Sequence, residues 1–285
     1  ASTDTGHKGG TSAFAIGHRE KLIDFGYRAI HEMTVQAKAI ITSFYKKPAT
    51  LSYWNGCSTG GRQALVEAQR YPDDFDAILA GAPANNHVRM QISRLAVSVP
   101  TARDPAAAVS NAKLAMVNRA VLEACDAKDG VKDGFLNDPR ACTFDVATLQ
   151  CSGAETDSCL TAPQVATMKS AYAPVTLPNG EYVFPGKELG SETAWGIVGG
   201  AADSLGAIGS QVAHANAQWD PRTFDLAADL RLAMDNVGFA TNAVDPDLSK
   251  FKARGGKLLL YHGWSDGLDR KSTRLNSSHV SESRM

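Results

Sequence analysis

The sequence predicts an α/β fold in which helices pack on a parallel sheet and a large domain is inserted into the chain. Helix-like and strand-like segments alternate between residues 20 and 80, a succession typical of parallel sheets. A further run, Lys-Leu-Leu-Leu-Tyr at residues 257–261, is typical of a strand buried on both faces. The 285 residues, 44% hydrophobic and 21% charged, suffice for a full globular core.

The elements before the insertion follow from the spacing of apolar side chains. Residues 20–45 carry apolar side chains every three or four positions and predict an amphipathic helix. Pro48 lies just beyond its predicted end, since proline cannot continue a helix. Residues 49–55 predict a strand, residues 62–70 a helix and residues 77–80 a second, buried strand.

The chain is therefore divided into four parts. Residues 1–84 form the N-terminal part of the core, and residues 85–254 form an inserted lid domain, in which residues 111–124 are helical. Residues 255–269 return to the core. Residues 270–285 are serine-rich, with few apolar side chains and no periodicity. They are interpreted as a tail foreign to the fold, in which residues 271–278 resemble the translated read-through of a sequencing adapter, and an ordinary disordered tail is the alternative.

Charge and hydropathy exclude several kinds of partner. A formal net charge of −1 gives no electrostatic reason to expect nucleic acid or an anionic membrane surface as partner. The sequence has no apolar run long enough to cross a bilayer, and its first ten residues lack the features of a signal peptide. A small neutral substrate is expected, and the oligomeric state is left open.

The cysteines point to an oxidising compartment. Four of them lie in a polar, turn-rich stretch with little apolar material: Cys125, Cys142, Cys151 and Cys159. Four cysteines allow three pairings, and the sequential pairing closes two short loops. Two local disulfides predict a secreted or periplasmic protein, while four free thiols in a cytoplasmic protein are the alternative. Cys57 is left without a partner.

The segment Gly56-Cys57-Ser58-Thr59-Gly60 places a serine between a predicted strand and a predicted helix. This is the context of a nucleophile elbow in the α/β-hydrolase fold, where glycines permit a sharp turn and the serine hydroxyl is exposed. Ser58 is the candidate nucleophile, and the backbone N–H of Thr59 is a candidate oxyanion donor. Gly60-Gly61 would let the helix approach closely. A glycine-rich turn without catalytic function is the alternative.

Asp266 is the candidate acid of a catalytic triad. In α/β-hydrolases the triad follows the order serine, acid, histidine, with the acid on a loop after a later strand. His262-Gly263-Trp264-Ser265-Asp266 follows the predicted strand at residues 257–261. An aspartate that forms a turn is the alternative. The long separation of Asp266 from Ser58 supports the inserted domain.

The catalytic histidine is expected to be missing from this sequence. His279 is the only histidine after Asp266, and it lies in the predicted tail, so we reject it as the base. The remaining histidines precede the expected position and are interpreted as structural or surface residues: His7, His18, His31, His87, His214 and His262. A serine without its base is a weak nucleophile. We therefore expect the sequence as it stands to be nearly inactive.

Several motifs resemble the tannase/feruloyl esterase family over nearly all of residues 1–266. The motifs are Gly56-Cys57-Ser58-Thr59-Gly60-Gly61-Arg62-Gln63, Ala68-Gln69-Arg70-Tyr71-Pro72-Asp73-Asp74-Phe75-Asp76, Ala80-Gly81-Ala82-Pro83-Ala84, Ser2-Thr3-Asp4-Thr5-Gly6-His7 and Asp24-Phe25-Gly26-Tyr27-Arg28-Ala29. The resemblance implies a serine esterase of phenolic or aromatic carboxylic esters, such as feruloyl or galloyl esters. Much of the substrate pocket would lie in the lid.

The resemblance also implies a role for Cys57. In the family, a cysteine beside the nucleophile forms a disulfide with a cysteine beside the catalytic histidine. Cys57 matches the first, and its partner would lie with the missing histidine. The family has an N-terminal strand and a glycine-rich oxyanion loop ahead of residue 1. Truncation at both ends is therefore the expectation.

A calcium site is expected in the lid. Asp126, Asp129 and Asp133 place three carboxylates in one short loop, and hard oxygen ligands suit Ca²⁺. A solvated acidic turn is the alternative from the residues alone. The resemblance implies a structural Ca²⁺ site in which the backbone carbonyls of Val131 and Phe135 join the carboxylates.

Two rival functions stay open. A peptidase or acyltransferase on the same fold would share the elbow around Ser58 and differ in the acceptor. A non-catalytic, calcium-dependent binding module is the rival from another class.

Overall fold

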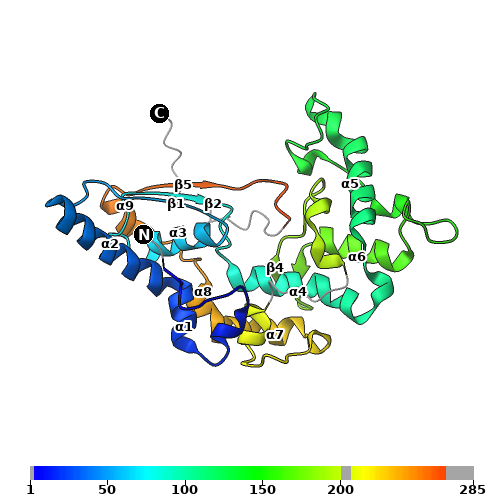
Figure 1. The fold of residues 1–285 in the computed structure, drawn as a ribbon. Coiled ribbons are helices and arrows are strands. Elements are labelled where there is room, and N and C mark those ends of the chain that lie inside the picture. Colours follow the sequence, from blue (N-terminus) through cyan, green and yellow to red (C-terminus); the bar gives the residue numbers. More distant parts are fainter. Residues whose placement is uncertain (1–2, 200–206, 268–285) are drawn as a thin grey trace.

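The computed structural model describes residues 3–199 and 207–267. Its centre is a parallel sheet in the order β1-β2-β5, formed by Tyr53–Cys57, Ala77–Gly81 and Lys257–Tyr261 (Figure 1). The strands pair in step, so that Cys57, Gly81 and Tyr261 stand side by side at their carboxyl ends. The predicted α/β class is confirmed, and the chain returns to this sheet at β5 after the long insertion.

The predicted helix over residues 20–45 is one helical run in three pieces: α1 (Arg19–Ile23), a π-helical turn (Asp24–Arg28) and α2 (Ala29–Tyr45). The π turn carries Gly26 against the backbone of Ala240, where a Cβ on residue 26 would lie 2.3 Å from the carbonyl oxygen. Only glycine permits this approach. Lys46, with a φ of 59°, ends α2 in the left-handed conformation.

One face of the sheet is covered by α3 (Thr59–Arg70) and α9 (Ser249–Ala253). Leu65 of α3 is fully buried there, in a cluster with Ile78 and Phe251. On the opposite face, Tyr53 and Leu259 are 66% and 58% exposed. The expectation of a strand buried on both faces at residues 257–261 is therefore wrong for this structure, because none of the described elements packs on that face.

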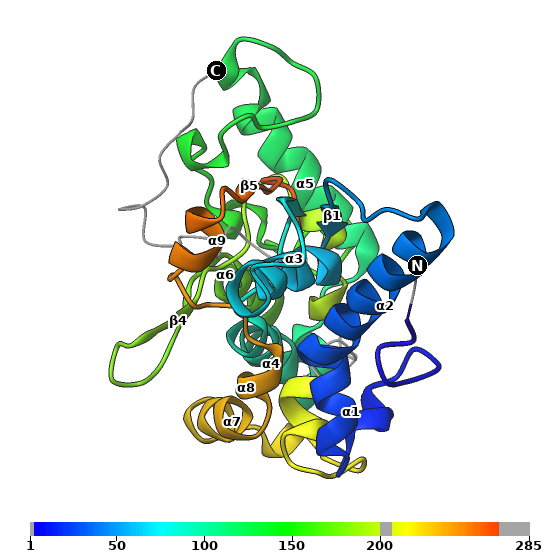
Figure 2. The same ribbon diagram turned by 90° about the vertical axis from the view of Figure 1, so that its left-hand side faces the viewer.

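The helix α4 (His87–Arg103) leaves the sheet and runs through the middle of the molecule between two apolar cores (Figures 1 and 2). Val88, Ile92, Leu95 and Val99 of α4 lie in a core shared with α1 and with α7 (Leu226–Ala233), whereas Val97 joins the core of a second lobe, built mainly from residues 109–198. The remaining elements are α5 (Asn111–Cys125), α6 (Ala162–Tyr172), α8 (Phe239–Thr241), and the antiparallel pair β3 (Val175–Thr176) and β4 (Tyr182–Phe184). The predicted helix at residues 111–124 corresponds to α5.

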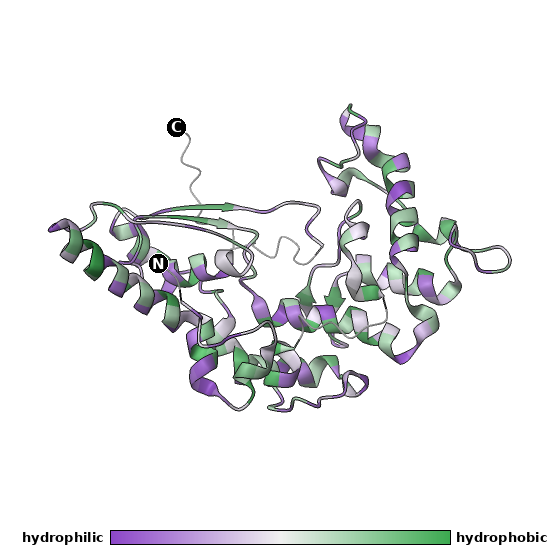
Figure 3. Cartoon of the chain, viewed as in Figure 1, coloured by the Kyte–Doolittle hydropathy of each residue, from purple (hydrophilic) through white to green (hydrophobic). Residues whose placement is uncertain are grey.

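The inserted region packs in two directions. Most buried apolar side chains between Val109 and Val198 share the core of the second lobe. Val183 and Phe184 of β4 instead join the core that contains α7 and the N-terminal helices, and α9 packs under the sheet. Figure 3 shows mostly apolar colour on the central strands and mixed polarity along the helices of the lobe. The boundaries at residues 84, 254 and 269 stay predictions, and the predicted tail at 270–285 lies outside the described residues. Within those residues, no helix is both long and apolar enough to span a bilayer.

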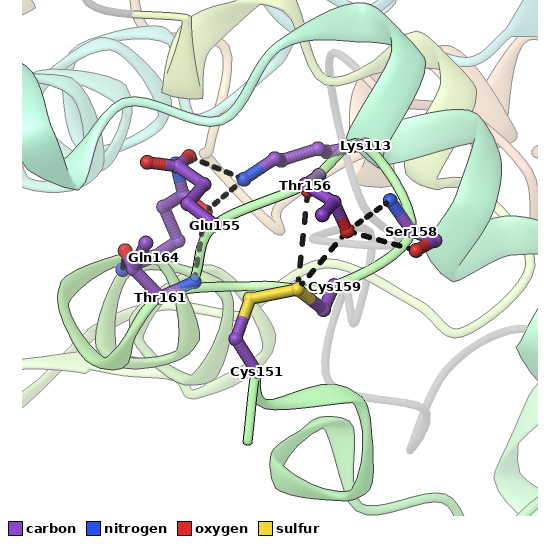
Figure 4. The surroundings of a disulfide bond; sticks show 8 residues. All are labelled: Lys113, Cys151, Glu155, Thr156, Ser158, Cys159, Thr161 and Gln164. Carbon is purple, nitrogen blue, oxygen red and sulfur yellow. Dashed lines mark hydrogen bonds and ion pairs between the residues drawn. A yellow bond between two sulfur atoms is a disulfide. The ribbon is translucent and has the colours of Figure 1, made fainter. Parts of the chain in front are cut away.

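Two disulfides tie the second lobe, Cys125–Cys142 and Cys151–Cys159. They follow the sequential pairing. Figure 4 shows the smaller loop beside the capping box of α6, where Thr161 and Gln164 exchange hydrogen bonds. Nζ of the buried Lys113 lies 2.5 Å from Glu155 and 2.7 Å from Gln164. These polar contacts hold the loop in place, since the loop itself has few apolar side chains to pack.

Candidate active site

Ser58 occupies a strained turn between β1 and α3. Its φ of 59° and ψ of −119° lie where side chains with a Cβ are rarely found, a strain typical of functional turns. The Ser58 amide donates to the carbonyl of Gly81 at 3.0 Å, and the Ser58 carbonyl accepts from the Arg62 amide at the same distance. Both bonds hold the turn, and the residue is exposed to solvent.

Two glycines make the turn possible by close backbone approach. A Cβ on Gly56 would lie 2.5 Å from the carbonyl oxygen of Gly60, and one on Gly61 would lie 2.3 Å from that of Gly81. A Cβ on Gly60 would meet nothing within 4 Å. The expectation that the pair Gly60-Gly61 permits close approach is therefore correct only for Gly61.

Thr59 is the first residue of α3. Amides in the first turn of a helix lack acceptors within the helix, and the helix dipole adds partial positive charge there. The turn therefore sets the Thr59 N–H and its neighbours beside the Ser58 side chain. This arrangement can stabilise a negative charge that develops on an oxygen near Ser58.

Asp266 lies beyond the carboxyl end of β5, at the same edge of the sheet as Ser58. Because β1 and β5 flank β2 in step, the backbones at Ser58 and His262 are separated by two strand spacings, about 10 Å. An intervening side chain is therefore needed to connect Ser58 with an acid on this loop. The structure brings both predicted residues to one edge of the sheet.

The structure also pairs Asp266 with His262, at 3.4 Å between Oδ2 and Nε2. The His262 side chain is 3% exposed and its Nδ1 atom is buried. In this placement the ring offers no nitrogen to solvent, where an ester would bind. This agrees with its interpretation as a structural histidine.

Three other histidines are likewise engaged elsewhere. Nδ1 of His31 and Nε2 of His214 each lie 2.6 Å from an aspartate, Asp74 and Asp229 respectively. His87 is buried, and burial, with the nearby Arg62 charge, lowers its pKa to about 3. His279 lies outside the described residues.

The loop that carries Asp266 is fastened to the second lobe. Nζ of Lys187 donates to the carbonyl of Gly267 at 2.6 Å, and the Arg140 guanidinium lies 4.8 Å above the ring of Trp264. A Cβ on Gly267 would lie 2.4 Å from that of Ala194. No sequence pattern signals these contacts, since the partners are far apart along the chain.

A cavity of about 450 Å³ lies in the lobe next to these contacts. Arg140 and Lys187 line it, together with Tyr172 and Lys169. Its wall thus combines an aromatic ring with cationic groups. Since two of its lining residues also hold the Asp266 loop, the cavity adjoins the candidate active site.

Cys57 is the last residue of β1 and directly precedes Ser58. Its side chain is exposed and free. The register places it on the open face of the sheet, level with Gly81 and Tyr261. A second thiol could reach it from that side without moving β1.

The predicted calcium loop holds its carboxylates by its own backbone. Asp126 is buried and accepts from the Gly134 amide at 2.9 Å, while Asp129 and Asp133 accept from the amides of Val131 and Phe135. The carboxylates supply hard oxygen donors of the kind that Ca²⁺ takes. The donor types therefore fit the ion. The oxygens of the three carboxylates do not all lie within 4.8 Å of one another, so the loop would have to close around a bound ion.

The elbow, the parallel sheet and the lobe define the chain as a protein of the α/β-hydrolase type. The chain matches the family described as tannase and feruloyl esterase over residues 1–274, and it belongs to that family.

Relatives and solved structures agree with this assignment. An uncharacterized esterase of Xanthomonas campestris pv. campestris is 39% identical over 93% of this chain and 50% of its own. A probable feruloyl esterase B-2 of Aspergillus flavus is 34% identical, over 93% and 51%. The crystal structure of feruloyl esterase B from Aspergillus oryzae has a TM-score of 0.86 and 30% identity, over 96% and 56%. The chain thus spans about half the length of these relatives.

Proposed function

We propose that this chain is part of a serine carboxylic ester hydrolase that acts on phenolic or aromatic esters, such as feruloyl or galloyl esters. The observation that carries the proposal is the exposed Ser58, held at positive φ between a parallel strand and a helix. Family membership supports the reaction class, and the names of the relatives support the substrate class.

In the proposed mechanism the Ser58 hydroxyl oxygen attacks the ester carbonyl carbon while a histidine base accepts its proton. The Thr59 N–H stabilises the oxyanion of the tetrahedral intermediate. Its collapse releases the alcohol, protonated by the same base, and leaves an acyl group on Ser58. Water, activated in turn by that base, then hydrolyses the acyl-enzyme. Asp266 orients the base and stabilises its protonated form.

The base itself would come from sequence beyond the described residues. We propose that it lies beside a cysteine that forms a disulfide with Cys57, which the exposed position of Cys57 at the end of β1 would permit. We also propose a structural Ca²⁺ in the loop of Asp126, Asp129 and Asp133. The two disulfides of the lobe support a secreted or periplasmic location.

The test is to recover the source gene beyond codon 267 and express its whole product. A His-Cys pair in the added sequence, together with hydrolysis of methyl ferulate that Ser58→Ala abolishes, is the expected result. An open reading frame that continues without such a pair would refute the proposed triad. Intact activity on a peptide or on acyl transfer, without ester hydrolysis, would favour the rival chemistry on the same fold.

A calcium-dependent binding module makes the opposite prediction. The Ser58→Ala variant of such a module would bind its ligand as well as the wild type does, and both proteins would lose binding on chelation. The ester hydrolase loses turnover with Ser58→Ala at unchanged folding. Mass spectrometry of the whole product checks the disulfide, since a free Cys57 thiol there would refute the link.

A further inference from the structure

A buried cluster of side chains that can bind a metal ion lies between α2, α3 and the segment before β2, away from the elbow. His31 of α2, Glu67 of α3 and Asp74, which precedes β2, each bring one ligand atom within 4.8 Å of the other two. Within residues 3–199 and 207–267 they form the one group of three histidine, cysteine or acidic side chains that meets this limit. The three residues come from three separate segments that pack around the sheet.

Glu67 is the member that the fold leaves unexplained. The residue is 1% exposed, and its two buried carboxylate oxygens accept no hydrogen bond from a donor group of the described residues. A buried carboxylate is costly unless it is paired, hydrogen-bonded, protonated or bound to a metal. Its neighbour in the cluster, Asp74, is also an acid and only 6% exposed.

The nearby cations do not supply the missing partner. Nζ of Lys38 donates to the backbone carbonyl oxygens of Asp73 and Asp74. His31 pairs with Asp74 through Nδ1 at 2.6 Å. One hydrogen-bonded histidine therefore faces two buried carboxylates.

We propose that His31, Glu67 and Asp74 form a binding site for a divalent transition-metal ion, with Zn²⁺ as the best match. One imidazole nitrogen and two carboxylate oxygens are ligands that Zn²⁺ accepts, and a water would complete four-coordination. The histidine argues against Ca²⁺ and Mg²⁺, which prefer oxygen.

The three side chains need to move only a short distance to surround an ion. A tetrahedral ion with bonds of about 2.0–2.2 Å holds its ligand atoms roughly 3.5 Å apart. The ligand atoms of the three residues lie at most 4.8 Å from one another, so the more distant ones would draw together, whereas Nδ1 of His31, now 2.6 Å from Asp74, would move roughly 0.9 Å away from it. The His31 ring is already fixed in plane by stacking on Tyr71, with 3.9 Å between centroids and 8° between planes. The bound ion would join α2, α3 and the turn before β2, and so fix the helix that begins at the elbow.

The test titrates the chelator-treated protein with Zn²⁺ by calorimetry in excess Ca²⁺, and with Co²⁺ by visible absorption. One equivalent of Zn²⁺ and a Co²⁺ spectrum of a bound, low-symmetry ion are expected. Glu67→Gln and His31→Gln should each weaken Zn²⁺ binding by at least about 100-fold. The wild-type melting temperature should rise on adding Zn²⁺, and those of the variants should not.

The chain offers a matched control in His214→Gln. The His214–Asp229 pair has the same 2.6 Å separation and nearly the same side-chain exposure as His31–Asp74, at 28% and 7% against 28% and 9%. It is not part of a group of three ligands among the described residues, so its loss should leave Zn²⁺ binding unchanged. His31→Gln alters a partly exposed residue, so folding is retained and read by circular dichroism. Absence of a stoichiometric site, or a site that survives His31→Gln, would overturn the proposal.

Discussion

Nζ of Lys187 lies 2.6 Å from the carbonyl oxygen of Gly267, the residue that follows Asp266. Lys187 belongs to the second lobe and Asp266 to the loop after β5, so one hydrogen bond couples the lobe to the candidate acid. The Arg140–Trp264 contact acts on the same loop. The lobe therefore helps to set where the Asp266 carboxylate stands.

Lys187→Met should loosen this loop. A partly buried hydrogen bond from a charged donor contributes about 1 kcal/mol or more, so amide hydrogen exchange at residues 263–266 should become about 5-fold faster. Lys169→Met is the control, because Lys169 lines the same cavity but faces Asp145 at 3.6 Å. Equal exchange in both variants would show that the Lys187 bond does not hold the loop.

Arg62→Ala should strongly destabilise the core behind the elbow. The buried guanidinium donates to the carbonyl oxygens of Gly26, Phe25 and Thr241 at 2.8, 3.1 and 3.5 Å, and its loss leaves these acceptors buried. We expect a decrease of about 3 kcal/mol or more in the free energy of unfolding, measured by urea denaturation. Arg70→Ala, which removes one exposed hydrogen bond to Phe239 and the contact of the guanidinium with the Tyr27 ring, should cost well under half as much.

Glu67 should make the metal-free protein less stable as the pH rises. Burial, and then the neighbouring Asp74, raises the pKa of Glu67 to about 9. The folded state therefore keeps a proton that the unfolded state releases near pH 4.5. The resulting stability is full below that pH and is lost as the pH rises toward 9, with a slope of at most about 1.4 kcal/mol per pH unit.

Urea denaturation in chelator between pH 5 and pH 9 measures this loss. Glu67→Gln cannot titrate and should show a flatter dependence than the wild type. Parallel curves for the two proteins would contradict the raised pKa of Glu67.

His87 should make the protein less stable as the pH falls. Burial, and then the Arg62 charge, lowers its pKa to about 3 from an ordinary value of 6.5. Between pH 6.5 and pH 3 the unfolded state binds a proton at His87 and the folded state does not. The free energy of unfolding therefore decreases as the pH falls through this range. The acid loss of stability should therefore be smaller in His87→Gln than in the wild type. A His87→Gln curve as steep as the wild-type curve would refute this assignment.

Much of the fold near the elbow could be predicted because local pattern determines it. The spacing of apolar side chains placed α2, α3 and α5, and the glycines around Ser58 marked the turn. The sequential cysteine pairs could be chosen because each closes a short loop.

Contacts between distant segments could not be predicted in this way. Gly26 of the π turn lies directly against the backbone of Ala240, and nothing near Gly26 in the sequence encodes that neighbour. The contact of Lys187 with Gly267 and the gathering of His31, Glu67 and Asp74 likewise depend on tertiary packing. The pairing of His262 with Asp266 is closer in sequence, but it occurs in a loop without a regular period to signal it.

The role of Ser58 can be read from a covalent adduct. The whole gene product is treated with a fluorophosphonate, which labels an activated serine, and the modified peptide is located by mass spectrometry. We expect one adduct, on Ser58, that forms in step with the loss of methyl ferulate hydrolysis, and a decrease of at least about 10⁴-fold in kcat for Ser58→Ala. Hydrolysis that persists in Ser58→Ala, or an adduct on another serine, would contradict this expectation.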